Sequence, residues 1–372
     1  VKGDYAYVCG TEDITIINIS DLRHPQIVAT LADDVINDFL SVCRIIDNHL
    51  IINGQEWVNA GSLRVLIFDL TNPAVPTLVS QKDLPYRFIQ NYWYSKGRMV
   101  FVPFGTLWSL GGQQGDFAAF DYSDFSDPKF LGALYGFQTD AGGIDGGGPD
   151  QIRTAIPIGA RYALLGLGDS QGSNDSSRGR ILTVDTLNPA QMSVVHETTV
   201  PGTKYMVGLG LVDQTLWVLG TNYSTAEWEA DFPYPDITLS AFDATNPLDL
   251  KLLKSIPMQG ITSTGMAWTT MTSLGNGFIA INNLQLDGNP VLMVVDVNDP
   301  LNPRYSTLAV AANLGEIQRR GNIVFAASDA GLGLYDIGQV LGLSYTAQVQ
   351  IPKNTGGSVV PSQAPRLRAE AD

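Results

Sequence analysis

Short apolar runs alternate with polar turns along the chain, and one phrase recurs. It appears as ITIINISDLRHPQIVATL from Ile14, as VLIFDLTNPAVPTLVSQ from Val65 and as VLMVVDVNDPLNPRYSTLAV from Val291. Each copy holds an apolar run, an Asp or Asn, a Pro-containing turn and a second run. β-Branched and aromatic residues bounded by Gly, Asn, Asp and Pro are typical of strands. The pattern therefore predicts a pair of strands at each copy.

The phrase recurs seven times when the copies are aligned on the polar residue that ends the first run. These residues are Asn18, Asp69, Asp121, Asp185, Asp243, Asp296 and Asp336, at intervals of 40 to 64 residues. A second apolar run precedes each copy, and a more polar strand precedes that run in the later copies. About four strands per repeat of roughly fifty residues are typical of a β-propeller. We therefore predict an all-β fold, a seven-bladed β-propeller of four-stranded antiparallel blades.

The pattern also predicts the domain organisation. The propeller is expected to span residues 1–351, followed by a tail at 352–372 with the composition of a linker. The first repeat lacks its innermost strand, because Val1 already leads into the second one. A closed ring needs that strand from elsewhere, either from sequence upstream of Val1 or from the tail, where GGSVVPS can add a strand.

Charge narrows the range of partners. The chain of 372 residues carries a net charge of −15, from 22 Lys and Arg against 37 Asp and Glu. Nucleic acids and anionic membranes are bound by basic faces, so neither is an expected partner. No apolar run reaches the roughly 20 residues that span a membrane.

Two cysteines, Cys9 and Cys43, are present. They form either a disulfide or two buried free thiols, and the sequence favours the thiols. Cysteine content therefore does not fix the compartment.

The chain resembles the LVIVD-repeat proteins. The resemblance lies in VKGDYAYVCG near the start, LRVLIFDLTNPAVP in the second repeat and LMVVDVNDPLNP in the sixth. It implies a β-propeller and export, so that the protein is expected to be secreted, extracellular or on the cell surface, with the periplasm as a further option. The family has no common catalytic residues to transfer.

The repeated Asp residues are expected to be structural. An Asp side chain accepts backbone N–H bonds in a turn, and Pro presets φ there. Repetition in every copy favours this role, because an active site is normally single. We therefore interpret Asp69, Asp121, Asp185, Asp243, Asp296 and Asp336 as turn residues.

Catalytic motifs are weak. The three histidines, His24, His49 and His196, have no metal-ligand spacing, and neither a nucleophile elbow nor a P-loop is present. The sequence therefore favours a non-catalytic exported module that binds a protein or glycan, or is structural, within a surface or extracellular assembly. An enzyme with a metal-assisted hydrolase or lyase site in the central funnel remains the alternative.

A candidate binding rim follows from the fold. In a propeller the innermost strands line one channel, so polar residues where these strands begin converge. With one aromatic from an insertion, the candidate ligand-binding residues are Asp38, Asn91, Arg153, Lys204, Thr264, Glu316 and Trp228. The alternative is that this rim only holds water.

Two glycine-rich insertions form a candidate Ca²⁺ site. Their acids are Asp140, Asp145 and Asp150 in the first and Asp169 and Asp175 in the second. Oxygen ligands in flexible loops suit a hard cation, although the EF-hand spacing is absent. Plain flexible loops are the alternative reading, and no other cofactor is expected.

A chelation experiment tests the Ca²⁺ site. We expect millimolar Ca²⁺ to raise the melting temperature and EDTA to reverse the rise, because a ligand of the folded state stabilises it by mass action. Loop cleavage by protease should slow in parallel. Identical melting and cleavage with Ca²⁺ and with EDTA would contradict the site.

Overall fold

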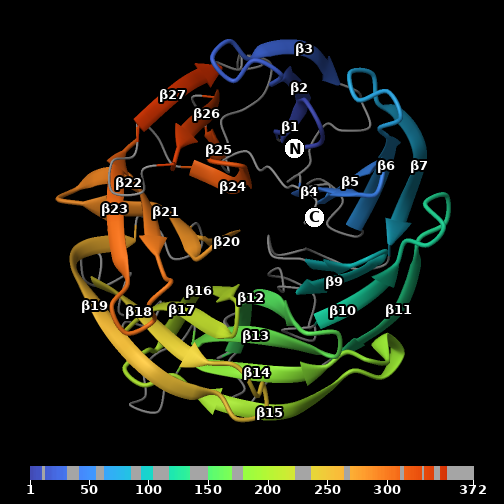
Figure 1. Cartoon of the computed structure of the whole chain (residues 1–372). Helices are drawn as coiled ribbons and strands as arrows, with labels where there is room; N and C mark the ends of the chain where they lie inside the picture. The colour runs from blue at the N-terminus through green and yellow to red at the C-terminus, as the bar shows by residue number, and fades with distance from the viewer. Residues whose placement is uncertain are drawn as a thin grey trace.

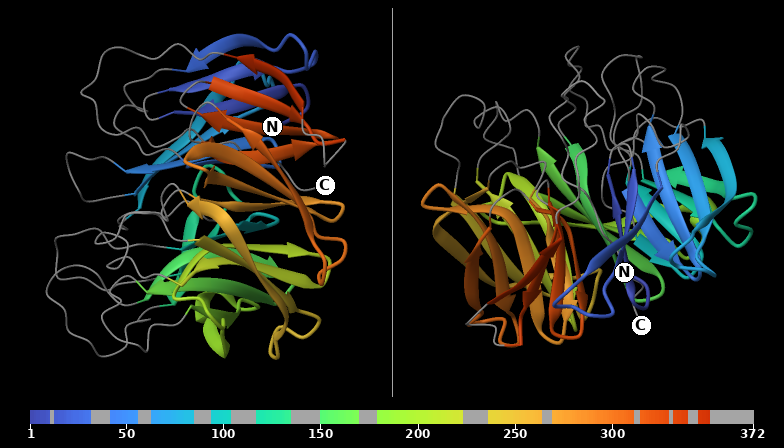
Figure 2. Two further views of the ribbon diagram at one scale, coloured as in Figure 1. Left: turned by 90° about the vertical axis from the view of Figure 1, so that its left-hand side faces the viewer. Right: turned by 90° about the horizontal axis from the view of Figure 1, so that it is seen from above.

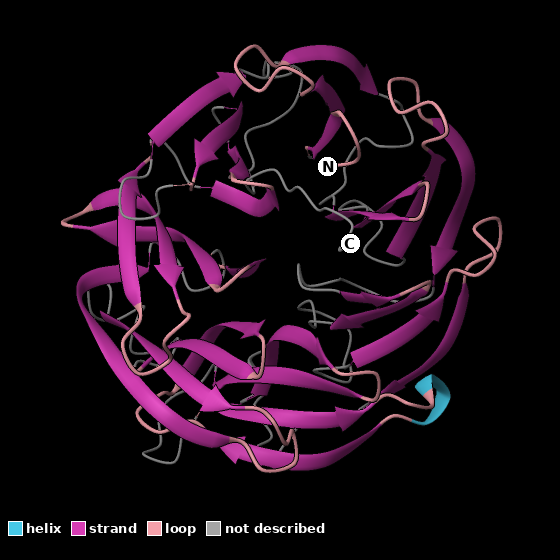
Figure 3. Ribbon diagram, in the orientation of Figure 1, coloured by secondary structure: helices cyan, strands magenta, loops and turns pink. Residues whose placement is uncertain are grey.

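The structure is a computed structural model in which strands are arranged as a ring around a central axis (Figure 1). It describes residues 1–10, 13–31, 42–55, 63–84, 94–103, 117–134, 150–169, 179–222, 236–263, 269–310, 314–328, 331–338 and 344–349. The only helix among these is the 3-10 turn η1 (Pro189–Gln191), in cyan in Figure 3. The predicted tail at 352–372 lies outside the described residues.

Each sheet is built from strands that follow one another in the chain. The first sheet contains β1 (Tyr5–Cys9), β2 (Ile14–Asn18) and β3 (Gln26–Leu31). The second contains β4 (Val42–Ile46), β5 (His49–Gln55), β6 (Leu63–Asp69) and β7 (Thr77–Leu84). The third contains β8 (Tyr94–Lys96), β9 (Met99–Pro103), β10 (Phe117–Asp121) and β11 (Lys129–Leu134). The fourth contains β12 (Asp150–Ile158), β13 (Tyr162–Asp169), β14 (Arg180–Asp185) and β15 (Ser193–Thr199).

The fifth sheet is the largest. It contains β16 (Tyr205–Val212), β17 (Thr215–Thr221), β18 (Asp236–Asp243), β19 (Lys251–Ser263), β20 (Met271–Gly275), β21 (Phe278–Leu286), β22 (Asn289–Asp296) and β23 (Arg304–Ala309). The last sheet contains β24 (Leu314–Arg320), β25 (Ile323–Ser328), β26 (Gly331–Asp336) and β27 (Ser344–Val349). The paired strands are antiparallel, as predicted, and the fold is an all-β propeller.

The prediction of seven four-stranded blades is wrong. In the described part of the chain, five sheets have four or more strands, four of them four-stranded and one eight-stranded, and a further sheet has three. The cause lies in β19, whose 13 residues outrun its own repeat. Its last residues, Ile261–Ser263, pair with Leu284–Leu286 of β21. Two consecutive repeats are thereby joined into one hydrogen-bonded sheet.

The hydrophobic core lies between neighbouring sheets. One cluster packs Tyr7 and Ile16 of the first sheet on Cys43 and Leu50 of the second. The other clusters join successive repeats in the same way around the ring. Each sheet therefore buries both of its faces, which explains why the middle strands are apolar at nearly every position.

The repeated Asp residues make the predicted turns. In every repeat the aligned side chain accepts a hydrogen bond from the backbone N–H two residues later, over 2.7–3.2 Å. In the first six repeats a second Asx residue does the same within the turn: Asp21, Asn72, Asp124, Asn188, Asn246 and Asp299. The interpretation of the six Asp residues as turn chemistry is confirmed.

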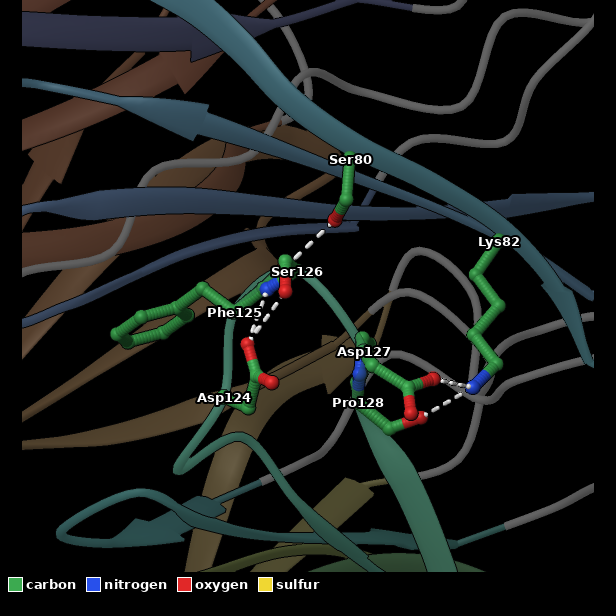
Figure 4. Close-up of polar contacts among 7 residues, drawn as sticks. All are labelled: Ser80, Lys82, Asp124, Phe125, Ser126, Asp127 and Pro128. Atoms are coloured by element: carbon green, nitrogen blue, oxygen red, sulfur yellow. Dashed lines mark hydrogen bonds and ion pairs between the residues drawn. The ribbon is translucent and has the colours of Figure 1, made fainter.

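These turns also attach each repeat to the preceding one. Figure 4 shows the turn of the third repeat, where the Ser80 hydroxyl donates to the Phe125 carbonyl over 2.7 Å. Lys82, on the same strand as Ser80, donates to the Pro128 carbonyl over 2.8 Å and pairs with Asp127. The Thr183 hydroxyl bonds the Pro247 carbonyl in the same manner. The turn thus reverses the chain and also accepts hydrogen bonds from the neighbouring repeat.

The ring is closed between the last sheet and the first. Arg320 donates to the Gly3 carbonyl over 2.7 Å and pairs with Asp4 over 3.1 Å. The Val1 ammonium group donates to Gln318 over 3.0 Å in a buried position. An apolar cluster containing Val1 and Phe325 spans the same junction.

A disulfide joins Cys9 at the end of β1 to Cys43 in β4, and no cysteine is free. The preference for buried free thiols was therefore wrong. Both residues are almost fully buried, as that preference assumed. Burial does not exclude a disulfide, because the fold brings the two strands together.

Loss of this bond should destabilise the protein. The bridge spans 34 residues of sequence, and the chain-entropy model assigns such a loop about 3–4 kcal/mol. We expect the Cys9→Ser/Cys43→Ser variant to lose that amount of unfolding free energy in urea denaturation, with a steeper slope because the unfolded chain is less compact without the bridge.

Treatment with dithiothreitol should lower the midpoint of the native protein and leave the variant unaffected. Equal stability of the two proteins would contradict a stabilising role for the bridge.

Candidate ligand-binding rim

The strands run between the two ends of the ring, as the side views show (Figure 2). The turn end carries the Asx–Pro turns. The loop end is the opposite one, where the innermost strands β4, β8, β12, β16, β20 and β24 begin. The predicted binding rim belongs to the loop end.

Two predicted rim residues lie at interruptions of the innermost strands. The register between β12 and β13 shifts between Ile152 and Thr154, which leaves Arg153 at a β-bulge. The register between β24 and β25 shifts between Leu314 and Ile317, and Glu316 lies in that bulge. Bulges re-aim side chains and are frequent beside functional sites. β12 and β24 lie on different sides of the central axis (Figure 1).

A third rim residue, Lys204, stands directly before β16. Its backbone N–H donates to the Thr221 carbonyl over 2.9 Å, which fixes the start of the strand. Its side chain is half-buried. The preceding Thr203 carbonyl accepts the Gly179 N–H over 2.6 Å, so the segment is also attached to the fourth sheet. Arg153 and Lys204 therefore come from consecutive innermost strands.

Buried amides hold the backbone beside Glu316. Asn282 is fully buried and donates to the Leu314 carbonyl over 3.0 Å and to the Gly315 carbonyl. Asn283 donates to the same Leu314 carbonyl and accepts the Leu314 N–H, each over 2.7 Å. Two side chains from β21 thus fix the first two residues of β24, immediately before Glu316.

The Asn pair occupies a bulge of its own. The register between β21 and β22 shifts between Ile281 and Leu284, and Asn283 adopts a left-handed φ of 53°. Asn tolerates this region better than other non-glycine residues. On the other side, Asn282 Oδ1 accepts the Thr270 N–H over 2.7 Å. Our sequence reading missed this pair, although two consecutive amides inside an apolar strand were a visible signal.

The remaining rim predictions fall outside the described residues. They are Asp38, Asn91, Thr264 and Trp228. The structure gives the backbone positions of Arg153, Lys204 and Glu316, and the rim hypothesis as a whole stays a prediction.

The candidate Ca²⁺ ligands are partly placed. Asp150 and Asp169 face each other as cross-strand partners at the loop end of β12 and β13. The register thus pairs one backbone position from each predicted loop, and the Ca²⁺ site stays a prediction. Asp140, Asp145 and Asp175 lie outside the described residues. Where the structure is described, no group of three or more His, Cys, Asp or Glu residues is arranged to hold a metal.

The histidines lie away from the rim. His24 pairs with Asp21 in a turn, and His196 is on the outermost strand β15. His49 begins β5 at the turn end and stacks on Phe125 with ring centroids 3.7 Å apart. Burial lowers the pKa of His49 from its ordinary value, against the opposing influence of nearby acids. None of these positions converges with the innermost strand starts.

Basic residues at the turn end serve the fold. The Arg161 guanidinium bonds Asp185 over 2.6 Å and lowers the pKa of that carboxyl. Burial lowers the pKa of Lys96, whose ammonium group donates to the Tyr162 carbonyl over 3.2 Å and to Thr186 over 3.0 Å. Lys96 is thus engaged by the neighbouring repeat, and Arg161 by the turn of its own repeat.

Sequence comparison confirms the resemblance to LVIVD-repeat proteins. Residues 1–33 match the model of the LVIVD repeat. No curated protein matches the chain. Within the described residues, no helix is long and apolar enough to cross a membrane.

Solved structures share the fold at low identity. The periplasmic gluconolactonase of Pseudomonas aeruginosa superimposes with a TM-score of 0.65 at 11% identity, covering 98% of this chain and 99% of that one. A hypothetical selenium-binding protein from Sulfolobus tokodaii gives 0.60 at 14% identity, covering 98% and 93%. A functionally unknown protein from Desulfotomaculum acetoxidans gives 0.58 at 10% identity, covering 93% and 96%. At these identities the similarity establishes the fold alone.

The Asn282 contacts predict a large effect of mutation. Replacing Asn282 with Ala leaves the Leu314 and Gly315 carbonyls and the Thr270 N–H without this partner, so we expect a loss of about 2–3 kcal/mol in unfolding free energy. Chemical denaturation measures it. Asn289→Ala is the matched control, because this exposed Asn lies in the β21–β22 hairpin. A loss no greater than that of the control would contradict the role of Asn282.

Proposed function

We propose that this protein is an exported β-propeller that binds a protein or glycan ligand at the loop end of its ring. The observation that carries the proposal is the pair of bulges at Arg153 and Glu316, both on innermost strands. Regular pairing is interrupted at the positions that the sequence pattern had singled out for binding.

The charge of the rim suggests the chemistry of the ligand. The chain has only 22 Lys and Arg residues, and two of them, Arg153 and Lys204, come from consecutive innermost strands at this end. An acidic group on a glycan or a protein side chain suits such a pair.

Export is supported by the disulfide. Such bonds persist in oxidising compartments and are rare in the cytosol, and the Cys9–Cys43 bond is buried in the core between two sheets. The fold neighbour from Pseudomonas aeruginosa is itself periplasmic by name. Both observations support export, to the periplasm or beyond, as part of the proposal.

Calcium is part of the proposal at the same end. Asp150 and Asp169 are cross-strand partners at this end of β12 and β13. A hard cation bound by these acids would favour ligand binding at Arg153 indirectly.

An enzymatic function is the second candidate, and one observation favours it. The gluconolactonase neighbour matches this chain over nearly the whole length of both. An assay of gluconolactone hydrolysis in a pH-stat, with and without added divalent cations, separates the two functions. Hydrolysis that disappears when rim residues are substituted would show that the protein is a hydrolase and would contradict the proposal of a non-catalytic binding module.

The binding proposal is tested by a double substitution. A glycan array that includes acidic glycans, and a pull-down from the extracellular fraction of the source cells, identify the ligand. We expect Arg153→Ala/Lys204→Ala to weaken it by about 1–3 kcal/mol, because charged hydrogen bonds are lost. Isothermal titration calorimetry measures the change.

The matched control is Lys129→Ala/Lys251→Ala, which removes the same net charge from exposed positions on the outermost strands β11 and β19. It should bind as the native protein does. Unchanged affinity in the rim variant, or an equal loss in the control, would rule the rim out.

A further inference from the structure

One outermost strand of the ring lacks a bulge that the others share. In six of the seven repeats, the register between the outermost strand and its neighbour skips one residue of the outermost strand. β23, in the sixth repeat, is the exception among the described strands, since it pairs with β22 continuously from Arg304 to Ala309. Bulges bend an edge strand and hinder its pairing with another chain. The edge of β23 is therefore without this protection. The skipped residues of the other strands are Val28, Val79, Leu131, Val195, Leu253 and Thr346.

Hydrogen bonding to β22 determines which backbone groups of β23 point outward. The Val310 N–H donates to the Pro290 carbonyl over 3.0 Å, so these two residues form a hydrogen-bonded pair. Successive pairs of an antiparallel ladder alternate between bonded and non-bonded types. The even-numbered residues of β23 therefore bond β22, and the N–H and C=O groups of Tyr305, Thr307 and Ala309 point away from it. In the described part of the chain, no strand pairs with β23 on that outer side.

Charge makes this edge suitable for contact with a second copy of the chain. The net charge of −15 opposes association wherever acidic surfaces of two copies meet. β23 contains no acidic residue, and its one charged residue, Arg304, lies at the start of the strand and pairs with Asp296. The five residues that follow Arg304 in β23 are uncharged. Two such strands can therefore lie side by side without opposing like charges.

The sequence of β23 is complementary to itself in one antiparallel register. The register that uses all three outward residues is centred on Thr307, which then faces its own counterpart. Tyr305 faces Ala309 of the second copy, so the pairing places the largest outward side chain, which is 47% exposed, against the smallest. Each of these pairs exchanges two backbone hydrogen bonds. The same surface is used on both copies, so the contact closes as a two-fold dimer.

We propose that β23 is a dimerisation edge, at which two copies of this chain pair antiparallel about Thr307 and continue one sheet across both molecules. One strand of six residues contributes on each side, so the interface is small and the dimer is concentration-dependent. β23 lies on the outer circumference of the ring (Figure 1), away from the innermost strands. The inference goes beyond ligand binding at the rim and does not depend on it.

Sedimentation velocity over a concentration series tests the proposal. The native protein should shift toward the mass of two chains as its concentration rises. Thr307→Pro removes the central outward N–H and no bond to β22. We expect this variant to raise the dimer dissociation constant by about tenfold or more, because backbone hydrogen bonds between the copies are lost.

Gln81→Pro is the matched control, on the bulged outermost strand β7. Alternation counted from the Leu70 N–H, which donates to the Asn48 carbonyl, shows that the exposed Gln81 also directs its N–H outward. This variant should dimerise as the native protein does. A native protein that stays monomeric at every concentration, or an equal loss in the two proline variants, would overturn the proposal.

A cross-link keeps the test decisive should the proline variant fail to fold. A hydrogen-bonded pair has Cα atoms about 5.5 Å apart, within the range that a disulfide spans. Both native cysteines are in the Cys9–Cys43 bond, so Thr307→Cys introduces a single free thiol at the two-fold axis. On mild oxidation we expect roughly ten times the yield of covalent dimer given by Gln81→Cys. Equal yields for the two variants would overturn pairing at β23.

Discussion

The structure depends on contact between neighbouring sheets, because every sheet is apolar on both faces. A sheet with one apolar face can stand against solvent, but here a middle strand such as β10 (Phe117–Asp121) is buried at four consecutive positions. The apolar surface of each repeat is removed from water only when the repeats before and after it are in place. A ring satisfies this requirement at every repeat, and the cluster around Val1 and Phe325 satisfies it at the junction of the last sheet with the first.

Polar residues form the turns of this apolar ring and hydrogen-bond neighbouring repeats to one another. The double Asx turn reverses the chain, and its carbonyls then receive hydroxyl or ammonium groups from the preceding repeat, as at Phe125 and Pro247. One short motif thus stabilises both the hairpin and the contact between repeats. At the opposite end, Asn282 and Asn283 hold β24 through side-chain amides. The first Asx bond of the turn recurs in every repeat, as expected of a structural element, and the proposed binding rim lies at the opposite end.

The disulfide and the salt bridge of Arg320 both lie at the first sheet. This sheet has three strands in the described part of the chain. The bonds at Cys9 and Asp4 attach it to the second sheet and to the last one. An oxidising compartment would then matter for stability as well as for location.

The sequence by itself determined what depends on neighbours in the chain. The strands and the repeat follow from the local pattern of apolar runs and polar turns. The turn role of Asp69 or Asp296 follows from hydrogen bonds within a few residues. These features can therefore be recognised in the sequence alone. Tertiary structure alone decided contacts between distant residues. The pairing of the end of β19 with β21 set the number of sheets. Cys9 and Cys43 form a disulfide because the fold brings their Cα atoms to 6.3 Å from each other. The pairing of Asp150 with Asp169 also depends on strand register, and so do the hydrogen bonds from Asn282 to β24. Register is fixed when whole faces of the sheets pack together, so the local sequence does not encode it.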